Sequence, residues 1–203
     1  MYLRANQVSV EPGRVDELIR YVQEQVLPVV NEQDGSRGLA MGADRESGRC
    51  TIVSFWDDLD SLQASESRIG ASRDEARTRY GATFDVTVAE IIEMHIRQQP
   101  QPGCWNRVSM LDLAPDDIDA ATEAFRASTL PALEAMDGFC AAMLCADRPG
   151  GRAVAVTTWR DHDALRASTE RANTLRQEVR DKAHAEIAAV MELEVVISQV
   201  RPS

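Results

Sequence analysis

The sequence contains one pattern of residues twice, and this repeat limits the possible folds more than any other feature. Residues 56–65, WDDLDSLQAS, are matched by residues 159–168, WRDHDALRAS, at an offset of 103 residues. The same offset aligns about twenty identical residues without a gap, where average composition gives roughly six by chance. The repeat therefore predicts two similar units, residues 1–97 and 104–203, joined by the linker 98–103.

Each unit shows the order strand, helix, strand, strand, helix, strand. Apolar residues recur at helical spacing in the first helix of each unit, and Pro28 predicts that this helix ends or bends near residues 27–30. In the second unit we expect the last helical region to run to Ile187. The predicted strands are rich in β-branched and aromatic residues and span 3–10, 35–43, 49–56, 84–96, 105–113, 139–145, 152–159 and 191–200.

The expected fold class is α+β, with two ferredoxin-like units, each an antiparallel four-stranded sheet with helices on one face. A single apolar stripe on each first helix covers one sheet face and leaves the other face exposed. Large exposed apolar faces are unusual, so we expect the units to pack sheet to sheet as an intrachain dimeric α/β barrel with a cavity between the sheets. The alternative is two separate beads, each pairing with another chain.

Composition excludes several classes of function. The net charge of −11 argues against a nucleic-acid partner. No apolar run approaches the ~18 residues of a membrane span, and the N-terminus lacks the pattern of a signal peptide. The four cysteines are not repeated between the units and show no Cys-x-x-Cys spacing, so we expect reduced thiols in a cytoplasmic protein and no metal site.

The element order, together with Trp56 and the Asp58, Leu62 and Ala64 pattern after it, resembles the antibiotic biosynthesis monooxygenase (ABM) family. The resemblance covers nearly all of both units. It implies a dimeric α/β barrel, here a tandem duplication forming an internal pseudo-dimer, and it leaves a further homodimer open. Activities on this fold include cofactor-independent oxygenation of aromatic polyketides, quinol oxidation and heme degradation, so the implied partner is a small aromatic molecule.

The heme-degrading branch of that family combines an Asn on the first strand with a Trp and a His on the second helical segment. Asn6 looks like the first of these. The Trp position, nine residues after Trp56, is Ser65, and it is Ser168 in the second unit. No histidine lies between residues 67 and 80, so we do not expect heme degradation.

Three residues are candidates for catalysis: Asn6, Arg4 and His95. Asn6 could bind a substrate carbonyl or a developing oxyanion, or it could be satisfied within its strand. Arg4 and its counterpart Arg107 could bind an anionic oxygen, or they could form ion pairs with Glu90 and Glu194. His95 could act as a general base because its pKa lies near neutrality, or it could be structural.

Four residues are candidates for substrate binding: Trp56, Trp159, Arg107 and Ser109. The tryptophans could stack on an aromatic ligand or pack as corners of the core. Ser109 stands where the first unit has Asn6, so the two units should differ in any pocket. No phosphate loop, His-Glu metal cluster or nucleophile elbow is present, and we therefore expect no metal, flavin or nicotinamide cofactor.

Two hypotheses of function follow. The first is a cofactor-independent monooxygenase acting on an aromatic polyketide or quinol-type molecule, in which the substrate supplies the electrons. The second is a non-catalytic module for small-ligand binding or assembly on the same barrel fold, suggested by the serines at positions 65 and 168.

Overall fold

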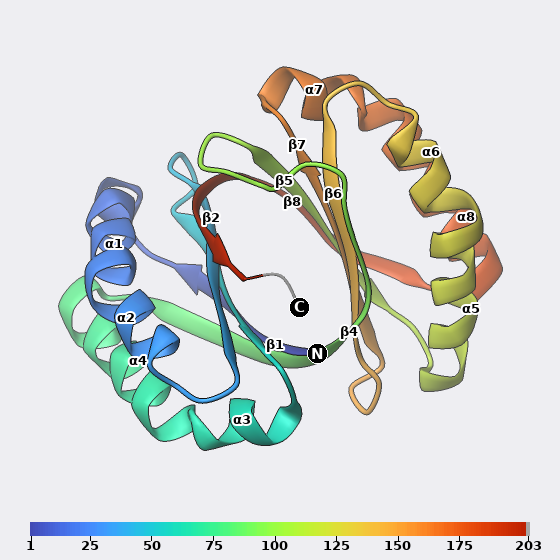
Figure 1. Ribbon diagram of the computed structural model, residues 1–203. Coiled ribbons are helices and arrows are strands. Elements are labelled where there is room, and N and C mark those ends of the chain that lie inside the picture. The colour runs from blue at the N-terminus through green and yellow to red at the C-terminus, as the bar shows by residue number, and fades with distance from the viewer. Residues whose placement is uncertain (202–203) are drawn as a thin grey trace. The chain divides into compact units, whose positions relative to one another are not determined.

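The computed structural model describes residues 1–201, and the chain divides into two compact units (Figure 1). Unit 1 comprises residues 1–89 together with the segment from Val195 onward, and unit 2 comprises residues 90–194. The last two residues of the predicted second unit lie outside the described part. Because each unit is folded around its own core, the two are described in turn.

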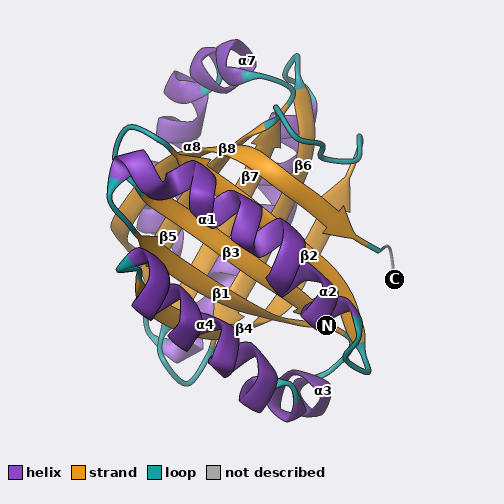
Figure 2. Ribbon diagram, turned by 90° about the vertical axis from the view of Figure 1, so that its left-hand side faces the viewer, coloured by secondary structure: helices purple, strands orange, loops and turns teal. Residues whose placement is uncertain are grey.

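In unit 1, helices cover one face of an antiparallel sheet (Figure 2). The strands are neighbours in the order β4-β1-β3-β2-β8. The elements are β1 (Tyr2–Ser9), α1 (Val15–Tyr21), η2 (Val22–Val26), α2 (Leu27–Asn31), β2 (Ser36–Asp44), β3 (Arg49–Trp56), α3 (Leu59–Ala64), α4 (Glu66–Tyr80) and β4 (Thr83–Ile96), with a 3-10 turn η1 (Pro12–Arg14) before α1.

Unit 2 repeats this arrangement, with the strand order β8-β5-β7-β6-β4. Its elements are β5 (Trp105–Asp112), η3 (Pro115–Asp117), α5 (Ile118–Ala124), η4 (Phe125–Thr129), α6 (Leu130–Glu134), β6 (Phe139–Asp147), β7 (Arg152–Trp159), α7 (His162–Ala167), α8 (Thr169–Ala183) and β8 (Glu186–Val200). The predicted order strand, helix, strand, strand, helix, strand is present in both copies of the repeat. The complete strand order closes on itself, β1-β3-β2-β8-β5-β7-β6-β4, so the predicted fold class is confirmed.

The compact units differ from the repeat boundaries at the two long strands, β4 and β8. Residues 90–96 of β4 pair with β6, from Glu90 opposite Ala146 to Ile96 opposite Ala141. They therefore cluster with unit 2, although the repeat places them at the end of the first copy. Likewise, Arg201, just after β8, donates its backbone N–H to the Arg37 carbonyl of unit 1 at 2.8 Å.

The first helix of each unit continues through a proline and ends soon after it, in unit 1 at Asn31, one residue beyond the predicted range of residues 27–30. Residues 22–26 and 125–129 form one wider, π-helical turn, in which Leu27 N–H bonds to the Val22 carbonyl and Leu130 N–H to the Phe125 carbonyl. Pro28 and its counterpart at 131 follow at once. A proline inside a helix lacks an N–H and collides with the carbonyl four residues earlier. The wider turn shifts that carbonyl, so the helix can go on to Asn31.

The last helix of unit 2 is shorter than expected, and the strand after it is longer. α8 ends at Ala183 because His184 adopts the left-handed conformation with φ 48°, and β8 begins at Glu186 rather than near residue 191. The register between β8 and β5 shifts where Met110 faces Ala189 and Leu111 faces Ile187. The shift places one extra residue of β8, Ala188, between these two pairs.

Each unit has one hydrophobic core between its sheet and its helices. Trp56 and Trp159 are fully buried in the cores of unit 1 and unit 2. Asp58 and Asp161 cap the short helices, accepting bonds of 2.8 Å from the backbone N–H groups of Ser61 and Ala164. None of the helices in residues 1–201 combines the length and apolar character that crossing a membrane requires.

Candidate functional site

Each unit contains a small cavity between its sheet and its helices. The cavity of unit 1 has a volume of about 30 Å³ and that of unit 2 about 60 Å³. Alternate residues of β1 and β5 face the helices, which brings Asn6 into the first cavity and Arg107 and Ser109 into the second. Both cavities therefore lie between the sheet and the helices of one unit, and not between two sheets as expected.

The cavity of unit 1 contains two buried polar atoms without partners, one acceptor and one donor. Asn6 is 5% exposed; its Nδ2 donates to the Ile52 carbonyl at 3.1 Å, and its Oδ1 has no hydrogen-bond partner. Arg73, from α4, forms an ion pair with Glu66 through Nη2, while its Nη1 is buried without a partner. Unpaired buried polar atoms are rare and costly, so this pair fits a ligand group that both donates and accepts a hydrogen bond.

Tyr21 adds a further polar group to the lining of the first cavity. Its hydroxyl lies 3.0 Å from the Ser72 carbonyl and 3.2 Å from Glu75 Oε2. Burial, reinforced by the Glu75 carboxylate, raises the pKa of Tyr21 to about 12. The hydroxyl is therefore protonated at neutral pH and serves as a donor, not as a base.

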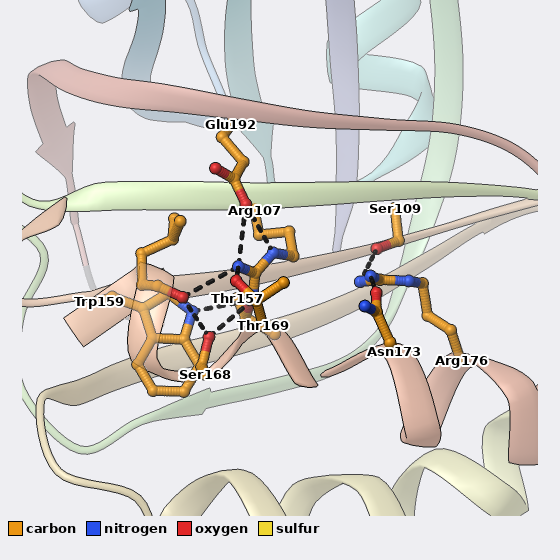
Figure 3. A network of polar contacts seen from close by, with 10 residues as sticks. Arg107, Ser109, Thr157, Trp159, Ser168, Thr169, Asn173, Arg176 and Glu192 are labelled. Carbon is orange, nitrogen blue, oxygen red and sulfur yellow. Dashed lines mark hydrogen bonds and ion pairs between the residues drawn. The ribbon is translucent and has the colours of Figure 1, made fainter. Parts of the chain in front are cut away.

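The cavity of unit 2 carries more positive charge (Figure 3). Arg107 comes from β5 and Arg176 from α8, and both line the cavity with Ser109 and Thr129. Arg176 Nη1 donates to Ser109 Oγ at 3.4 Å, and its Nη2 contacts the Asn173 side-chain oxygen. The Thr129 hydroxyl oxygen is buried without a partner. Most of the remaining lining is apolar, with several alanines that leave room.

Arg4 and Arg107 hold the short helix of their unit against the first strand. Arg4 donates to the Leu62 carbonyl at 2.7 Å and to Ser65 Oγ at 3.0 Å. Arg107 makes the corresponding bonds to the Leu165 carbonyl at 2.9 Å and to Ser168 Oγ at 2.6 Å (Figure 3). Each guanidinium thereby satisfies a carbonyl at the C-terminal end of a helix, where cations are favoured. Ser65 and Ser168 are thus engaged in hydrogen bonds to these arginines.

The carboxylate partners of these arginines are not the predicted Glu90 and Glu194. Arg4 pairs with Glu66 at 3.0 Å, and Arg107 pairs with Glu192 at 2.8 Å. Glu66 begins α4, whereas Glu192 lies on β8, two residues before the expected position. In unit 2 the error lies in the pairing of β5 with β8, because Glu192 stands directly opposite Arg107 whereas Glu194 stands opposite Trp105.

Burial and neighbouring charges lower the pKa of two of the arginines, Arg4 and Arg176. Burial lowers the pKa of Arg4, the nearby Glu66 carboxylate raises it, and the charge of Arg73 lowers it further. Burial also lowers the pKa of Arg176, as does the positive charge of Arg107, while Glu192 acts in the opposite direction. The second cavity therefore holds two cations that destabilise one another.

Trp56 and Trp159 lie in the cores and line neither cavity. Trp56 Nε1 donates to Ser54 Oγ at 3.0 Å, and Trp159 Nε1 donates to Thr157 Oγ1 at 3.1 Å. Both side chains have 0% exposure. Their positions match the interpretation of each Trp as a corner of the core, and stacking on a ligand would require the core to open.

His95 lies in unit 2, near the end of β4, and lines neither cavity. Its Nε2 is 2.7 Å from Glu134 Oε1, and its ring stacks on Phe139 with centroids 6.3 Å apart. Arg4 and Asn6 belong to unit 1, whereas His95 belongs to unit 2 because the second half of β4 clusters with that unit.

Sequence reasoning missed Arg73 and Arg176, the two helix arginines that reach the cavities. They are aligned by the same offset of 103 residues that identifies the repeat. Their signal was therefore present, but each lies in a polar helix whose charged residues are typical of a solvated face. Only the fold shows that these two turn inward.

The chain is similar in sequence and in fold to several known proteins. Residues 1–69 match the family described as "Antibiotic biosynthesis monooxygenase". Uncharacterized protein Rv2558 of Mycobacterium tuberculosis is 34% identical over 99% of this chain and 86% of its own length, and Rv2557 of the same organism is 30% identical over 99% and 90%. The crystal structure of an anthrone oxidase-like protein superposes with a TM-score of 0.71 at 15% identity, covering 100% of this chain and 94% of that one. At that identity the likeness shows the fold alone.

Proposed function

The chain belongs to the antibiotic biosynthesis monooxygenase family, and from this premise we propose that unit 1 oxygenates an electron-rich phenol or quinol without a bound cofactor. The observation that carries the proposal is the pair of unpartnered atoms in its cavity, Asn6 Oδ1 and Arg73 Nη1. A phenolic hydroxyl donates to the first and accepts from the second. The family match also covers residues 1–69, which lie in this unit and include Asn6.

The roles of these two residues follow from which atom is free. Since the Asn6 amide nitrogen is already bonded to Ile52, its free oxygen accepts a hydrogen bond and binds the neutral hydroxyl. The Arg73 guanidinium then stabilises the phenolate or enolate that forms when the proton leaves. The lining contains neither a carboxylate nor a histidine, so the proposal assigns no protein base: a water molecule takes the proton of the substrate, whose pKa is lowered by Arg73, and the proton returns in the product water.

For an anthrone-type substrate, the reaction balances without an external reductant. The methylene carbon loses two hydrogens and gains one oxygen atom from O₂ as a carbonyl, and the second oxygen atom leaves with both hydrogens as water. The substrate supplies all the electrons. The protein contributes burial, orientation and charge stabilisation.

An aromatic substrate requires the cavity of unit 1 to widen. Its volume of about 30 Å³ suits little more than a water molecule, whereas a cavity that binds benzene measures about 150 Å³. The π-helical turn Val22–Val26 contributes Val22 and Val26 to the lining. Such turns are frequent at functional sites, and the proposal assigns the opening to this segment.

Oxygen consumption with anthrone and with a benzoquinol tests the proposal, without added flavin or metal. We expect Asn6→Ala to lower kcat/KM by roughly tenfold to a hundredfold, because a buried hydrogen bond to the substrate is lost. Ser109→Ala, the same change at the equivalent position of unit 2, should leave the rate unchanged. An absence of oxygen uptake by the wild type over a broad panel, or equal losses in both variants, would contradict the assignment.

A non-catalytic ligand-binding function is the second candidate, and the bonds of Ser65 and Ser168 favour it. Both serines are fixed to the helix anchors, so neither is free to act on a substrate. Native mass spectrometry of the purified protein separates the two functions. A retained small molecule that is not altered in the presence of O₂ supports binding alone.

A further inference from the structure

We infer that the cavity of unit 2 is a binding site for a small monocarboxylate with an apolar tail. The inference does not depend on oxygenation in unit 1, since it concerns different residues and is tested by binding alone. Its basis is the distribution of charge around Arg107 and Arg176 (Figure 3).

Most of the N–H donors of Arg107 are already engaged with partners in the protein. Its guanidinium donates to Ser168, Leu165 and Thr169, and it contacts Glu192 Oε1 through both Nε and Nη2, at 3.0 and 2.8 Å. Glu192 is thus held by Arg107 and neutralises that arginine, which is also bonded to the short-helix anchor.

Arg176, in contrast, is bonded only to neutral groups, Ser109 and Asn173. Among the residues that the structure describes, no carboxylate lies within ion-pair distance of its guanidinium. It is nevertheless partly buried and borders an apolar cavity. A buried cation without a counterion is costly, and a bound anion would offset that cost.

Thr129 supplies a second donor at the same cavity. Thr122 and Ser128 of this helix donate their hydroxyls to the carbonyls four residues earlier, each at 2.8 Å, as is usual in helices. Thr129, at the end of the π-helical turn, does not, and its hydroxyl oxygen is buried without a partner. Arg176 and Thr129 together offer charged and neutral donors of the kind that carboxylates accept.

The rest of the cavity defines the tail of the ligand. Its wall is formed by aliphatic and small side chains and one phenylalanine: Leu111, Leu113, Ala121, Phe125, Leu133 and Leu175. A volume of about 60 Å³ is smaller than the about 150 Å³ of a cavity that binds benzene, so this cavity too must widen to take a tail as long as that of hexanoate. The chain as a whole carries a net charge of −11, so long-range attraction does not bring anions here and the local arginine must.

The equivalent site in unit 1 is neutralised from within. Glu66 pairs with Arg4 through Oε2 and with Arg73 through Oε1, so that one carboxylate serves both arginines. Thr169 occupies the position of Glu66 in unit 2. This single difference leaves Arg176 without the counterion that Arg73 has. It also provides a test, because Thr169→Glu supplies a carboxylate to Arg176 and leaves the arginine in place.

Isothermal titration calorimetry with sodium hexanoate tests the inference, with hexan-1-ol as the uncharged analogue. We expect saturable hexanoate binding at millimolar concentrations or below, and hexan-1-ol binding weaker by roughly tenfold or more. Arg176→Gln should weaken hexanoate binding by roughly tenfold to a hundredfold, and Thr169→Glu should weaken it similarly. The control Arg180→Gln, which removes an exposed charge of the same helix, should leave it unchanged.

The outcomes separate the inference from trivial anion binding. Equal affinity for hexanoate and hexan-1-ol, or an unchanged hexanoate affinity in Arg176→Gln, overturns it. So does an equal loss in Arg180→Gln, since that result indicates general electrostatics. If Arg176→Gln fails to fold, Thr169→Glu decides alone, because it leaves the arginine in place: retained binding in that variant overturns the inference.

Discussion

The two units use the same anchor but place its carboxylate on different elements, and this difference controls the charge in each cavity. In unit 1 the carboxylate is Glu66, at the start of α4, where it reaches both Arg4 and Arg73. In unit 2 it is Glu192, on β8, where it reaches only Arg107. A duplicated scaffold can thus acquire two different ligand preferences by relocating one acidic residue, while the arginines that hold the fold are retained.

The largest expected effect tests whether the scaffold is equivalent in both units. Trp56→Ala and Trp159→Ala each remove a fully buried ring from a core, so we expect each to lower the free energy of unfolding by about 4 kcal/mol. Urea denaturation measures both. Trp105→Ala is the control, because Trp105 is only partly buried and stacks on the exposed His162, and it should cost clearly less. A large difference between the first two variants would break the equivalence.

The next effect concerns the stability that Arg4 and Arg107 contribute, which the comparison predicts to be unequal. We expect Arg107→Met to destabilise the protein by about 3 kcal/mol and Arg4→Met by about 2 kcal/mol, because Arg107 makes more hydrogen bonds. The remaining carboxylates are partly exposed and can be hydrated, which limits both losses. Thermal unfolding of the two variants shows which loses more stability. Ser65→Ala and Ser168→Ala, which each remove one hydrogen bond to these arginines, should cost about 1 kcal/mol each. The opposite order would contradict it.

A smaller effect sharpens the comparison by converting one unit into the other. Glu66→Thr gives unit 1 the residue that unit 2 has at position 169, and it removes the counterion of Arg73. We expect the variant to gain a second hexanoate site, seen as a rise in calorimetric stoichiometry from one to two, with an affinity within roughly tenfold of the first. Unchanged stoichiometry would show that the carboxylate position alone does not decide the ligand preference.

The sequence was sufficient to predict the scaffold but not the sites. The order of strands and helices follows from local signals, and most predicted strands lie within about two residues of the observed ones, β8 being the exception because it begins at Glu186. The positions of Arg73 and His95 depend on tertiary structure. One is a helix residue that turns inward, and the other sits on a strand that passes from one compact unit to the next. The alternation of side chains along a strand predicts on which face of the sheet a residue lies. It does not predict which helix or strand packs against that face.

The smallest effect is the pH dependence of stability that arises from the helix caps Asp58 and Asp161. We expect it to be the same in both units because the two caps have the same geometry. Hydrogen bonds from backbone N–H groups, with a further bond from Ser61 at Asp58 and from Arg160 at Asp161, lower the pKa of both carboxyls. A lowered folded-state pKa stabilises the protein above the unfolded value of about 3.9, and this contribution is lost as the pH falls through the folded value.

Asparagine caps a helix about as well as aspartate but does not titrate. The stability difference between wild type and Asp58→Asn/Asp161→Asn should therefore be largest above about pH 5 and shrink toward pH 2. Urea denaturation across this range measures it, and the two single variants should contribute equally. A difference that grows on acidification would reverse the assigned sign. Unequal contributions would show that the units differ at their caps as well as in their cavities.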